Sequence, residues 1–347
     1  MKILFIAPNY LPHIGGVERH IESICREILK DNHSISILVQ KFDNSYSDYE
    51  RNNNLEIIRL NKSSKKIVRK IKIATYMLLN LKKILKYDII HFHDYETFWA
   101  YGLFVYPMLK LFGKKIYITF HGWEGDIPPK KSIIFKRKLI TAFTTANVSV
   151  GHFISKWYST KPDIVSYGGV DRVDNLSQNK ELYILFVGRL ASDTGIFDCV
   201  KAWEIMSKDN NLELVICGDG PLRQEVENYV NKYNIQRVVF KGYVNNVSSY
   251  IKDAKIIFTS GYLGILEALS YQKNVIAIYD NELKKDYLTM IPNYEEMMWV
   301  TDNRMENIIS VYHDVIINNV KKEIGYQYAC KNSWQKVKED YYKLWEL

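Results

Sequence analysis

The chain has 347 residues, of which 47% are apolar and 25% are charged. This composition is that of a globular protein and excludes a collagen-like or wholly disordered chain, and the length suits two medium-sized domains. Four scattered cysteines without a CxxC pair argue against a zinc site or a disulfide framework and fit a reducing compartment. The apolar runs are shorter than a membrane span or a signal peptide core. We therefore expect a cytoplasmic protein, either free or peripheral at the membrane face.

The net charge of +8 is unevenly distributed along the chain. Residues 1–170 hold 26 Lys and Arg against 14 Asp and Glu, a net charge of +12, and the remaining residues hold 21 against 25, a net charge of −4. The most basic segment, 61–88, has apolar residues near helical spacing with lysines between them. It fits either a solvated helix packed on the core or a basic amphipathic helix on an anionic membrane surface. Nucleic acid is disfavoured as a partner, because no recognition motif is present.

Strand-like and helix-like segments alternate along the whole chain. Runs rich in β-branched residues predict buried parallel strands, and apolar residues at helical spacing predict the helices between them. The predicted strands are 2–8, 34–40, 55–60, 87–93, 114–122, 145–150, 163–170, 182–190, 212–220, 238–244, 255–261 and 274–280. The predicted helices are 17–30, 64–86, 97–112, 131–142, 151–158, 195–208, 221–233, 246–253 and 263–271.

This alternation predicts an α/β protein with two Rossmann-like, doubly wound domains that face a central cleft. The domain boundary is expected in the turn-rich segment 167–181. We therefore predict an N-terminal domain over 1–170 and a C-terminal domain over 171–331. Ligands of such sheets bind outside the carboxyl ends of the strands.

Glycines follow several of the predicted strands and open the next helix. They are Gly15 and Gly16, Gly188 before Arg189, Gly218 and Gly220, and Gly261 and Gly264. Helix N-termini with free amides favour anions, and an arginine fork suits phosphate. Several such elements at one site predict a phosphorylated ligand. The segment "CGDGPLR" has Arg223 where a dinucleotide fingerprint has its third glycine, and no P-loop motif occurs, so a dehydrogenase or a P-loop NTPase is disfavoured.

The motifs taken together resemble those of the family 4 retaining glycosyltransferases, which have the GT-B architecture. The resemblance rests on Gly15-Gly16 and on "IIHFHD" (89–94), "TFHGWEG" (119–125), "YGGVD" (167–171), "FVGRL" (186–190), "CGDGPLR" (217–223), "FKGYV" (240–244) and "LGILEAL" (263–269). These segments are in order and span nearly the whole chain. The resemblance implies transfer of a hexose-type sugar from a UDP- or GDP-sugar to a glycan or lipid-linked glycan, with retained configuration. It also implies that helix 332–347 crosses back to the first domain.

The resemblance also implies roles for individual residues. Glu267 matches the acid that accepts hydrogen bonds from the nucleotide ribose, and a carboxylate can indeed receive both hydroxyls of a diol. The implied catalytic residues are His121, Arg189 and Glu124. The implied donor-binding residues are Gly16, Arg189, Gly218, Gly220, Tyr243, Gly261, Gly264, Ile265 and Glu267, and the acceptor-binding residues are Gly15, Arg19, His93 and Glu124. No cofactor is expected beyond the nucleotide-sugar substrate. No metal is expected, because His91 and His93 share a strand face without an evident third ligand.

Two positions depart from the family pattern. Thr259 occupies the position of a glutamate that contacts the donor sugar, and Thr194 that of a lysine bound to the diphosphate. Lys241, Lys273 and Arg223 are candidate substitutes. These departures keep two alternatives open: a nucleotide-sugar-binding subunit that supports a partner transferase, and a nucleotide-sugar epimerase on the same fold. The sequence does not indicate an oligomeric state.

Overall fold

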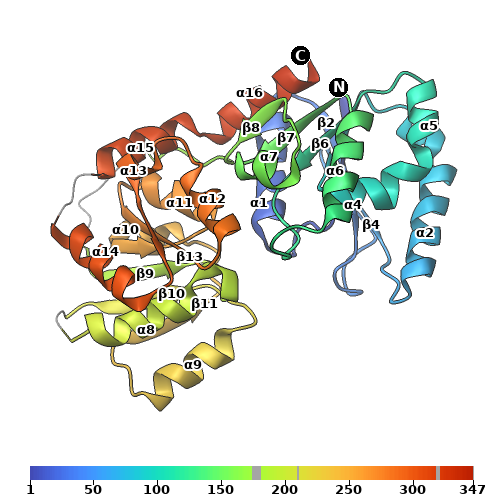
Figure 1. The fold of residues 1–347 in the computed structure, drawn as a ribbon. Coiled ribbons are helices and arrows are strands. Elements are labelled where there is room, and N and C mark those ends of the chain that lie inside the picture. The colour runs from blue at the N-terminus through green and yellow to red at the C-terminus, as the bar shows by residue number, and fades with distance from the viewer. Residues whose placement is uncertain (174–180, 209–210, 318–320, 347) are drawn as a thin grey trace. The chain divides into compact units, whose positions relative to one another are not determined.

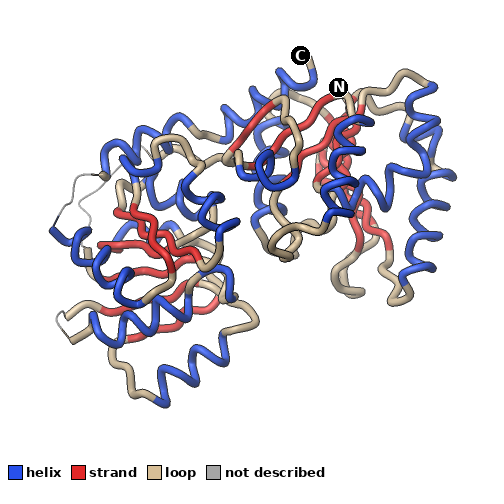
Figure 2. Tube along the Cα trace, viewed as in Figure 1, coloured by secondary structure: helices blue, strands red, loops and turns tan. Residues whose placement is uncertain are grey.

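The computed structural model describes residues 1–173, 181–208, 211–317 and 321–346, and it divides into two compact units (Figure 1). Unit 1 comprises Met1–Ser166 and Trp334–Leu347, and unit 2 comprises Tyr167–Ser333. Residues 174–180 of the predicted boundary segment lie outside the described residues. Each unit contains one sheet whose strands are flanked by helices (Figure 2). The predicted fold class, two Rossmann-like α/β domains, is confirmed.

Unit 1 is built on an eight-stranded sheet in the order β3-β4-β2-β1-β5-β6-β7-β8. Every neighbouring pair is parallel except β3 with β4 at the edge. The strands are β1 (Lys2–Ile6), β2 (Ser34–Gln40), β3 (Tyr49–Asn52), β4 (Leu55–Leu60), β5 (Ile89–His93), β6 (Ile116–Phe120), β7 (Ala146–Val150) and β8 (Ile164–Ser166). All five residues of β5 and of β6 are buried, as expected for central strands covered on both faces.

The helices of unit 1 follow the predicted alternation with two local differences. They are α1 (Gly16–Leu29), α2 (Lys66–Leu79), α3 (Leu81–Ile84), α4 (Tyr95–Thr97), a π-helical turn (Phe98–Gly102), α5 (Leu103–Leu111), α6 (Lys131–Phe143), α7 (Phe153–Tyr158) and α16 (Trp334–Trp345). The predicted helix 64–86 is interrupted at Asn80, whose side-chain amide donates to the Tyr76 carbonyl at 2.9 Å. The predicted helix 97–112 contains the π-helical turn in its first part.

The C-terminal helix α16 is part of unit 1, as the resemblance implied. It packs against α1, and its Tyr341 and Trp345 are buried. The indole N–H of Trp345 donates to His91 Nδ1 at 3.1 Å, so the helix is tied to the centre of the sheet. The last residues described are therefore a structural component of the first domain.

Unit 2 is built on a six-stranded parallel sheet in the order β11-β10-β9-β12-β13-β14. The strands are β9 (Tyr183–Val187), β10 (Glu213–Cys217), β11 (Val238–Gly242), β12 (Ala254–Phe258), β13 (Asn274–Tyr279) and β14 (Trp299–Asp302). The helices are a 3-10 turn (Ser192–Thr194), α8 (Ile196–Met206), α9 (Arg223–Lys232), α10 (Ser248–Asp253), α11 (Tyr262–Ser270), α12 (Glu282–Thr289), α13 (Tyr294–Met297), α14 (Met305–Ile317) and α15 (Lys322–Lys331). Strand β14 and helices α12–α15 were not predicted. The core is closed around Trp203, which is fully buried.

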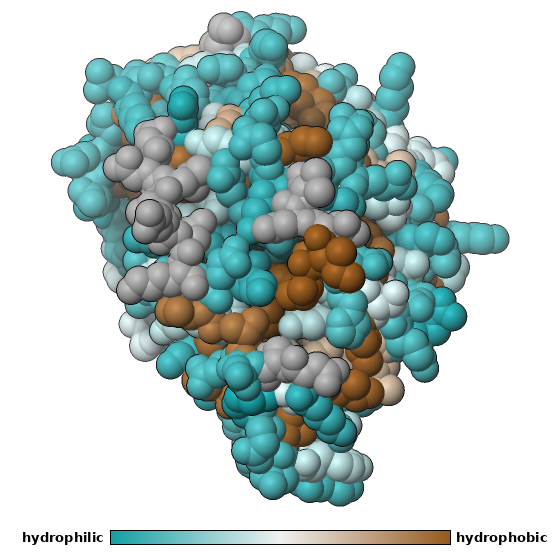
Figure 3. Space-filling view, turned by 90° about the vertical axis from the view of Figure 1, so that its left-hand side faces the viewer, coloured by the Kyte–Doolittle hydropathy of each residue, from teal (hydrophilic) through white to brown (hydrophobic). Residues whose placement is uncertain are grey.

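Hydrophilic side chains cover much of the face drawn in Figure 3, where the apolar side chains form interrupted patches. Within the described residues, no helix has the length and apolarity needed to cross a bilayer.

The assignment of α16 to unit 1 predicts a stability effect confined to that unit. Replacing Trp345 by Ala removes a buried aromatic side chain and its hydrogen bond, at a cost of about 3–5 kcal/mol. Hydrogen exchange followed by mass spectrometry should show lost protection in peptides of unit 1 and little change in unit 2. Trp203→Ala is the matched control and should give the reverse pattern. Equal loss in both units for Trp345→Ala would contradict this assignment.

Candidate functional site

The carboxyl ends of β1, β5 and β6 lie side by side in unit 1, and the loops after them carry the predicted residues of this half. In a parallel sheet these ends form the edge at which ligands bind. Strand β5 ends at His93, and His121 follows the last residue of β6. His93 Nδ1 and His121 Nε2 lie 2.9 Å apart, within hydrogen-bond distance. The register of the sheet therefore brings these two predicted residues together.

Two further buried histidines complete what we call the histidine cluster: His20, His91, His93 and His121. The His20 ring on α1 stands edge-on to that of His121, with 4.8 Å between ring centroids. Its Nε2 lies 3.1 Å from the Tyr341 hydroxyl of α16. His20 was not predicted, because a single histidine within a helix has no distinctive sequence pattern.

Burial makes the histidine cluster neutral at physiological pH. Removal from water lowers the pKa of His20, His91 and His93 well below the usual value, and neighbouring histidines lower it further. Burial, with a smaller contribution from the Arg137 charge, lowers the pKa of His121 to about 3. At pH 7 His121 can therefore donate or accept one hydrogen bond but carries no positive charge.

Asp94 fixes the backbone at this edge. Its carboxylate accepts a hydrogen bond from the His121 backbone N–H at 2.8 Å. Asp94 has a φ of 67° and a ψ of 153°, a backbone conformation that residues other than glycine rarely adopt. Burial raises its pKa, and the His121 N–H opposes that shift. Asp94 thus holds the loop that presents the His121 ring.

Glu124 forms a partly buried ion pair with Arg137. The Arg137 Nη2 is 2.5 Å from Glu124 Oε1, and the Tyr158 hydroxyl donates to Oε2 at 2.6 Å. Arg137 is 1% exposed, and its guanidinium stacks 3.8 Å from the Tyr158 ring centroid. Both carboxylate oxygens are thus engaged by neighbours. The arrangement suits Glu124 to holding the loop after β6, and an acceptor hydroxyl would compete with these bonds.

The loop between β1 and α1 is held by a second buried acid, Glu18. His13 Nδ1 lies 2.9 Å from Glu18 Oε1, and the side chain of Glu18 is buried. A Cβ on Gly15 would approach Glu18 Oε2 to 2.5 Å, so a larger residue here would have to displace the Glu18 carboxylate. Gly16 and Arg19 are exposed on the first turn of α1. Of the residues predicted in this loop, Gly15 packs closely against another group, the Glu18 carboxylate.

In unit 2 the glycines after β9 and β10 allow two loops to pack backbone on backbone. A Cβ on Gly218 would lie 1.8 Å from the Gly188 carbonyl oxygen, and one on Gly220 would lie 2.5 Å from that of Leu190. The Leu190 amide donates to the Asp219 carbonyl at 3.0 Å. The predicted donor-binding residues Gly218 and Gly220 therefore have a structural role in bringing these loops together.

The predicted cation Arg189 is exposed at this edge. Its guanidinium donates to both oxygens of Asp193, at 3.0 and 3.1 Å. Since 64% of the side chain is exposed, this pair is easily exchanged for another anion. Tyr243, also predicted, is half exposed just after β11.

Helix α11 begins with two amides available to a ligand. The Tyr262 N–H donates to the Tyr287 hydroxyl at 2.9 Å, and the Ile265 N–H donates to the Gly261 carbonyl at 2.9 Å. In the described part of the chain, the amides of Leu263 and Gly264 have no acceptor. The helix dipole adds partial positive charge at the same place. Of the predicted residues, Ile265 has its amide engaged by the Gly261 carbonyl, whereas the amide of Gly264 lies open at the helix start.

Glu267 lies one helical turn further along α11. Glu267 is buried, with only 8% of its surface exposed. With about 1.5 Å of rise per residue, it lies about 5 Å along the helix axis from the open amides. A Cβ on Gly264 would meet Thr259 Oγ1 at 2.4 Å, so Thr259 packs directly against this turn. Along the helix, the open amides of Leu263 and Gly264 therefore come first, and the carboxylate of Glu267 follows.

The three candidate substitutes for the missing lysine lie away from this helix start or are already paired. Arg223 binds Asp219 and Glu227, at 3.0 and 2.9 Å. Lys273 is buried at the other end of α11, before β13. Lys241 is exposed within β11. Instead, a lysine that sequence reasoning missed, Lys284 of α12, donates to the Ser260 carbonyl at 2.7 Å.

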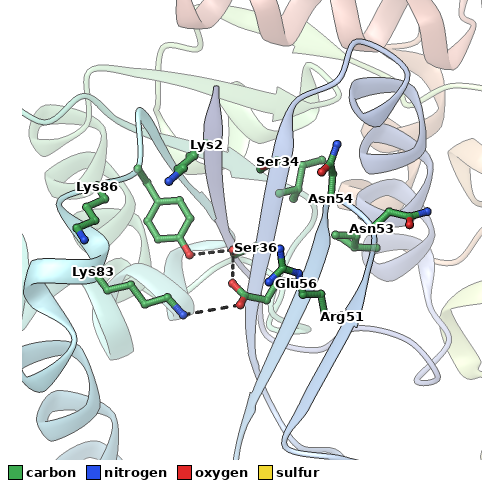
Figure 4. Close-up of a pocket in the computed structure, with 12 residues that line it drawn as sticks. Lys2, Ser34, Ser36, Arg51, Asn53, Asn54, Glu56, Lys83 and Lys86 are labelled. Carbon is green, nitrogen blue, oxygen red and sulfur yellow. Dashed lines mark hydrogen bonds and ion pairs between the residues drawn. The ribbon is translucent and has the colours of Figure 1, made fainter.

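A cavity of about 310 Å³ opens at the opposite, amino edge of the unit 1 sheet (Figure 4). Lys2 and Ser34 at the starts of β1 and β2 line it, together with Glu56 and Lys83. Glu56 accepts from Ser36 at 2.8 Å and lies 3.8 Å from the Lys83 ammonium. None of the predicted site residues lines this cavity. In the described ranges, no group of three histidine, cysteine or carboxylate side chains could hold a metal ion.

Family comparisons agree with this two-unit arrangement. The model "Glycosyl transferases group 1" matches residues 170–297, and "Glycosyltransferase Family 4" matches residues 14–168. Among solved structures, sucrose-phosphate synthase from Thermosynechococcus elongatus superposes with a TM-score of 0.77 at 16% identity, covering 99% of this chain and 98% of the other. Anabaena HepE, solved in complex with UDP and glucose, gives a TM-score of 0.71 at 12% identity over 99% and 98% of the chains. The fold is that of the GT-B glycosyltransferases.

The chain belongs to glycosyltransferase family 4. It is 23% identical to an uncharacterised glycosyltransferase of Methanocaldococcus jannaschii, covering 96% of this chain and 95% of the relative. It is 27% identical to the GalNAc-alpha-(1->4)-GalNAc-alpha-(1->3)-diNAcBac-PP-undecaprenol alpha-1,4-N-acetyl-D-galactosaminyltransferase of Campylobacter jejuni, covering 99% of this chain and 98% of the relative.

The neutral histidine cluster predicts loss of stability in mild acid. Because the folded-state pKa values lie below that of a free histidine, the unfolded chain binds more protons once the pH falls below about 6.5. Stability should therefore be constant above this pH and fall below it, by up to about 1.4 kcal/mol per pH unit for each histidine. Urea unfolding of unit 1, followed by hydrogen exchange between pH 7.5 and 5, measures this slope.

His20→Gln is the matched variant for this experiment, because it removes one of the four groups and keeps a side chain that can bond Tyr341. Its stability should fall less steeply with acid than that of the wild type. A flat profile for the wild type between pH 6.5 and 5 would show that the cluster is not neutral in the folded protein.

Proposed function

We propose that this glycosyltransferase transfers a hexose-type sugar from a UDP- or GDP-sugar to a hydroxyl of a glycan or lipid-linked glycan, with retention of the anomeric configuration. Unit 2 binds the nucleotide, and unit 1 supplies the acceptor side. The reaction requires no cofactor beyond the nucleotide-sugar and no metal ion. Membership of the family supports the reaction class, and the residues at the two carboxyl edges support the details.

The observation that carries the proposal is the order of groups on α11. The open amides of Leu263 and Gly264 suit a diphosphate, and Glu267 follows about 5 Å along the axis. A nucleoside diphosphate has its ribose diol at a similar distance from its phosphates, and a carboxylate can accept hydrogen bonds from both hydroxyls. The donor therefore fits with its diphosphate at the helix start and its ribose on Glu267.

The charge and proton requirements of the reaction can be met by these groups. Arg189 and the α11 amides stabilise the negative charge that grows on the departing diphosphate. The acceptor hydroxyl attacks from the face that the diphosphate leaves, and a phosphate oxygen takes its proton. Neutral His121 donates or accepts a hydrogen bond near the sugar. Glu124 is not required as a base, which agrees with its ion pair to Arg137.

A lipid-linked acceptor is supported by one relative and by one surface. The Campylobacter jejuni relative is named as acting on an undecaprenol-PP-linked glycan. In unit 1, α2 and α5 contact each other and leave large apolar side chains exposed. We call these the α2–α5 surface: Ile67, Ile71, Leu78, Leu79, Phe104, Met108, Leu111 and Phe112.

The α2–α5 surface fits an anionic membrane better than water. Leu79 and Leu111 are 80% and 76% exposed, while Ile73 and Met77 already fill the core side of α2. Exposed lysines lie on the same helices, at Lys70, Lys72 and Lys110. Apolar side chains flanked by lysines are the pattern of helices that lie in the headgroup region of anionic bilayers. The enzyme would then meet its acceptor at a membrane as a peripheral protein.

A nucleotide-sugar-binding subunit remains the second candidate, because Thr194 and Thr259 replace a lysine and a glutamate that the resemblance implies. It shares the nucleotide site but predicts no turnover with any donor and acceptor. A nucleotide-sugar epimerase predicts a changed sugar when donor is incubated without acceptor. Mass spectrometry and NMR of the same incubations distinguish the three activities.

The first test of the proposed function concerns Glu267. Glu267→Gln replaces a charged acceptor by a weaker one, so affinity for UDP or GDP should fall about 10- to 100-fold. The matched control is Glu225→Gln, which alters an exposed acid on α9 and should leave affinity unchanged. Isothermal titration calorimetry measures both.

The 2′-deoxy form of the same nucleotide tests whether Glu267 binds the ribose. The wild type should bind it about tenfold more weakly than the ribonucleotide, and Glu267→Gln should bind the two with similar affinity. If the variant discriminated as strongly as the wild type, Glu267 would not be the ribose acceptor.

The second test of the proposed function concerns the α2–α5 surface. The protein should bind vesicles that contain phosphatidylglycerol and not vesicles of phosphatidylcholine alone. Leu79→Glu and Leu111→Glu should each weaken binding about tenfold, because each removes an apolar insertion and adds a like charge to the lipid. Ile317→Glu, at an equally exposed apolar position of unit 2, should have little effect. Co-sedimentation measures binding, and equal binding of all variants would rule out this surface.

A further inference from the structure

Lys284 connects three loops at the carboxyl edge of the unit 2 sheet. It lies in α12, directly after the loop that follows β13, and its backbone N–H donates to the side chain of the cap residue Asn281 at 2.8 Å. Its ammonium donates to the Ser260 carbonyl at 2.7 Å. Ser260 immediately precedes Gly261, which caps α11, and its hydroxyl donates to the Thr194 carbonyl at 3.2 Å.

The position is an unfavourable one for a cation. Lys284 is 4% exposed, so its ammonium has lost most of its contact with water. It also lies beside the N-terminus of α11, where the helix dipole is positive and favours anions. The carbonyl of Ser260 and the face of the Tyr287 ring, 4.3 Å from the ammonium, offset part of this cost.

The charged side chains near Lys284 are Arg189 and Asp193, in the segment after β9, and Asp280, which follows β13. Burial, with a smaller contribution from Arg189, lowers the pKa of Lys284 to about 8, while Asp193 and Asp280 oppose the shift. Burial raises the pKa of Tyr287, so that its ring stays uncharged. Lys284 is therefore mostly protonated at pH 7 and neutral above about pH 9.

Resting on the function proposed above, we propose that Lys284 is the positioning residue for the diphosphate of the nucleotide-sugar, in a chain that has Thr194 in place of the expected lysine. Its ammonium engages the Ser260 carbonyl, which would otherwise repel an anion. It also adds buried positive charge behind the open amides of Leu263 and Gly264. The diphosphate would thus bind at a helix N-terminus whose positive potential is increased by the Lys284 ammonium.

A purely structural role for Lys284 makes different predictions. If it served only to tie α12 to the loop before α11, its loss would weaken folding and would affect all ligands of the site alike. A role in positioning the diphosphate instead predicts an effect that grows with the number of phosphates. The comparison of a nucleoside with its diphosphate therefore separates the two roles.

The experiment uses Lys284→Met, which keeps the length of the side chain and removes its charge. Affinity for the nucleoside diphosphate, UDP or GDP, that binds the wild type should fall about 10- to 100-fold. Affinity for the parent nucleoside should change by less than about twofold. Lys284→Arg keeps the charge and should retain more of the diphosphate affinity than Lys284→Met.

Lys273→Met is the matched control. Lys273 is also buried, and burial likewise lowers its pKa to about 8, but it lies at the far end of α11. Its replacement should lower the melting temperature without changing the ratio of diphosphate to nucleoside affinity. Both variants remove a buried charge. A difference between them in this ratio is therefore due to the position of Lys284 beside the start of α11.

A pH series on the wild type requires no variant and keeps the proposal testable if Lys284→Met does not fold. Between pH 7 and 9.5, diphosphate affinity should fall by up to about tenfold per pH unit above pH 8, and nucleoside affinity should not. Wild-type binding of diphosphate that is independent of pH, or equal ratios for Lys284→Met and the wild type, would overturn the inference. Failure of the wild type to bind any nucleoside diphosphate would overturn the proposed function itself.

Discussion

Burial of ionisable side chains at the carboxyl edges of two parallel sheets is the constraint on which the rest of this structure depends. Central strands such as β5 and β6 are covered on both faces, so the polar side chains at their ends are removed from water with them. Each buried group must then lose its charge or gain partners. In unit 1 the histidine cluster is neutral, and Glu124 is paired with Arg137. In unit 2 Lys284 is held by Ser260 and Tyr287.

Much of the fold was predictable because its signals are local. Except for the four-residue edge strand β14, "WVTD", the strands with β-branched runs were predicted, and so were the glycine loops after β9, β10 and β12. The edge strand β3, "YERN", was missed because all four of its residues are exposed and have no apolar pattern. The break at Asn80 was missed because it depends on a side-chain bond to Tyr76 within an otherwise continuous helical pattern.

The sequence predicted residues of the candidate site only where a family motif lies at the end of a predicted strand. His93 and His121 were predicted from motifs at the ends of strands, and the pairing of β5 with β6 in the structure brings them together. The partners of the other residues are distant in sequence. Glu124 is engaged by Tyr158, and Ser260 by Lys284, 24 residues away. A lysine in the polar segment "NELKKD" reads as a solvated residue, and only the packing of α12 next to β13 shows that it is buried.

The two threonines that depart from the family pattern bear on which proposed function holds. Replacing a lysine by Thr194 and a glutamate by Thr259 removes one charge of each sign, so the local net charge is conserved. Binding of a nucleotide requires mainly the ribose carboxylate and the helix amides, whereas transfer requires positive charge where the diphosphate departs. A cation at the diphosphate serves both functions, because it strengthens binding of the diphosphate and stabilises its departure. The buried Lys284 therefore fits a transferase and a binding subunit alike, and turnover of a donor with an acceptor is the property that separates the two.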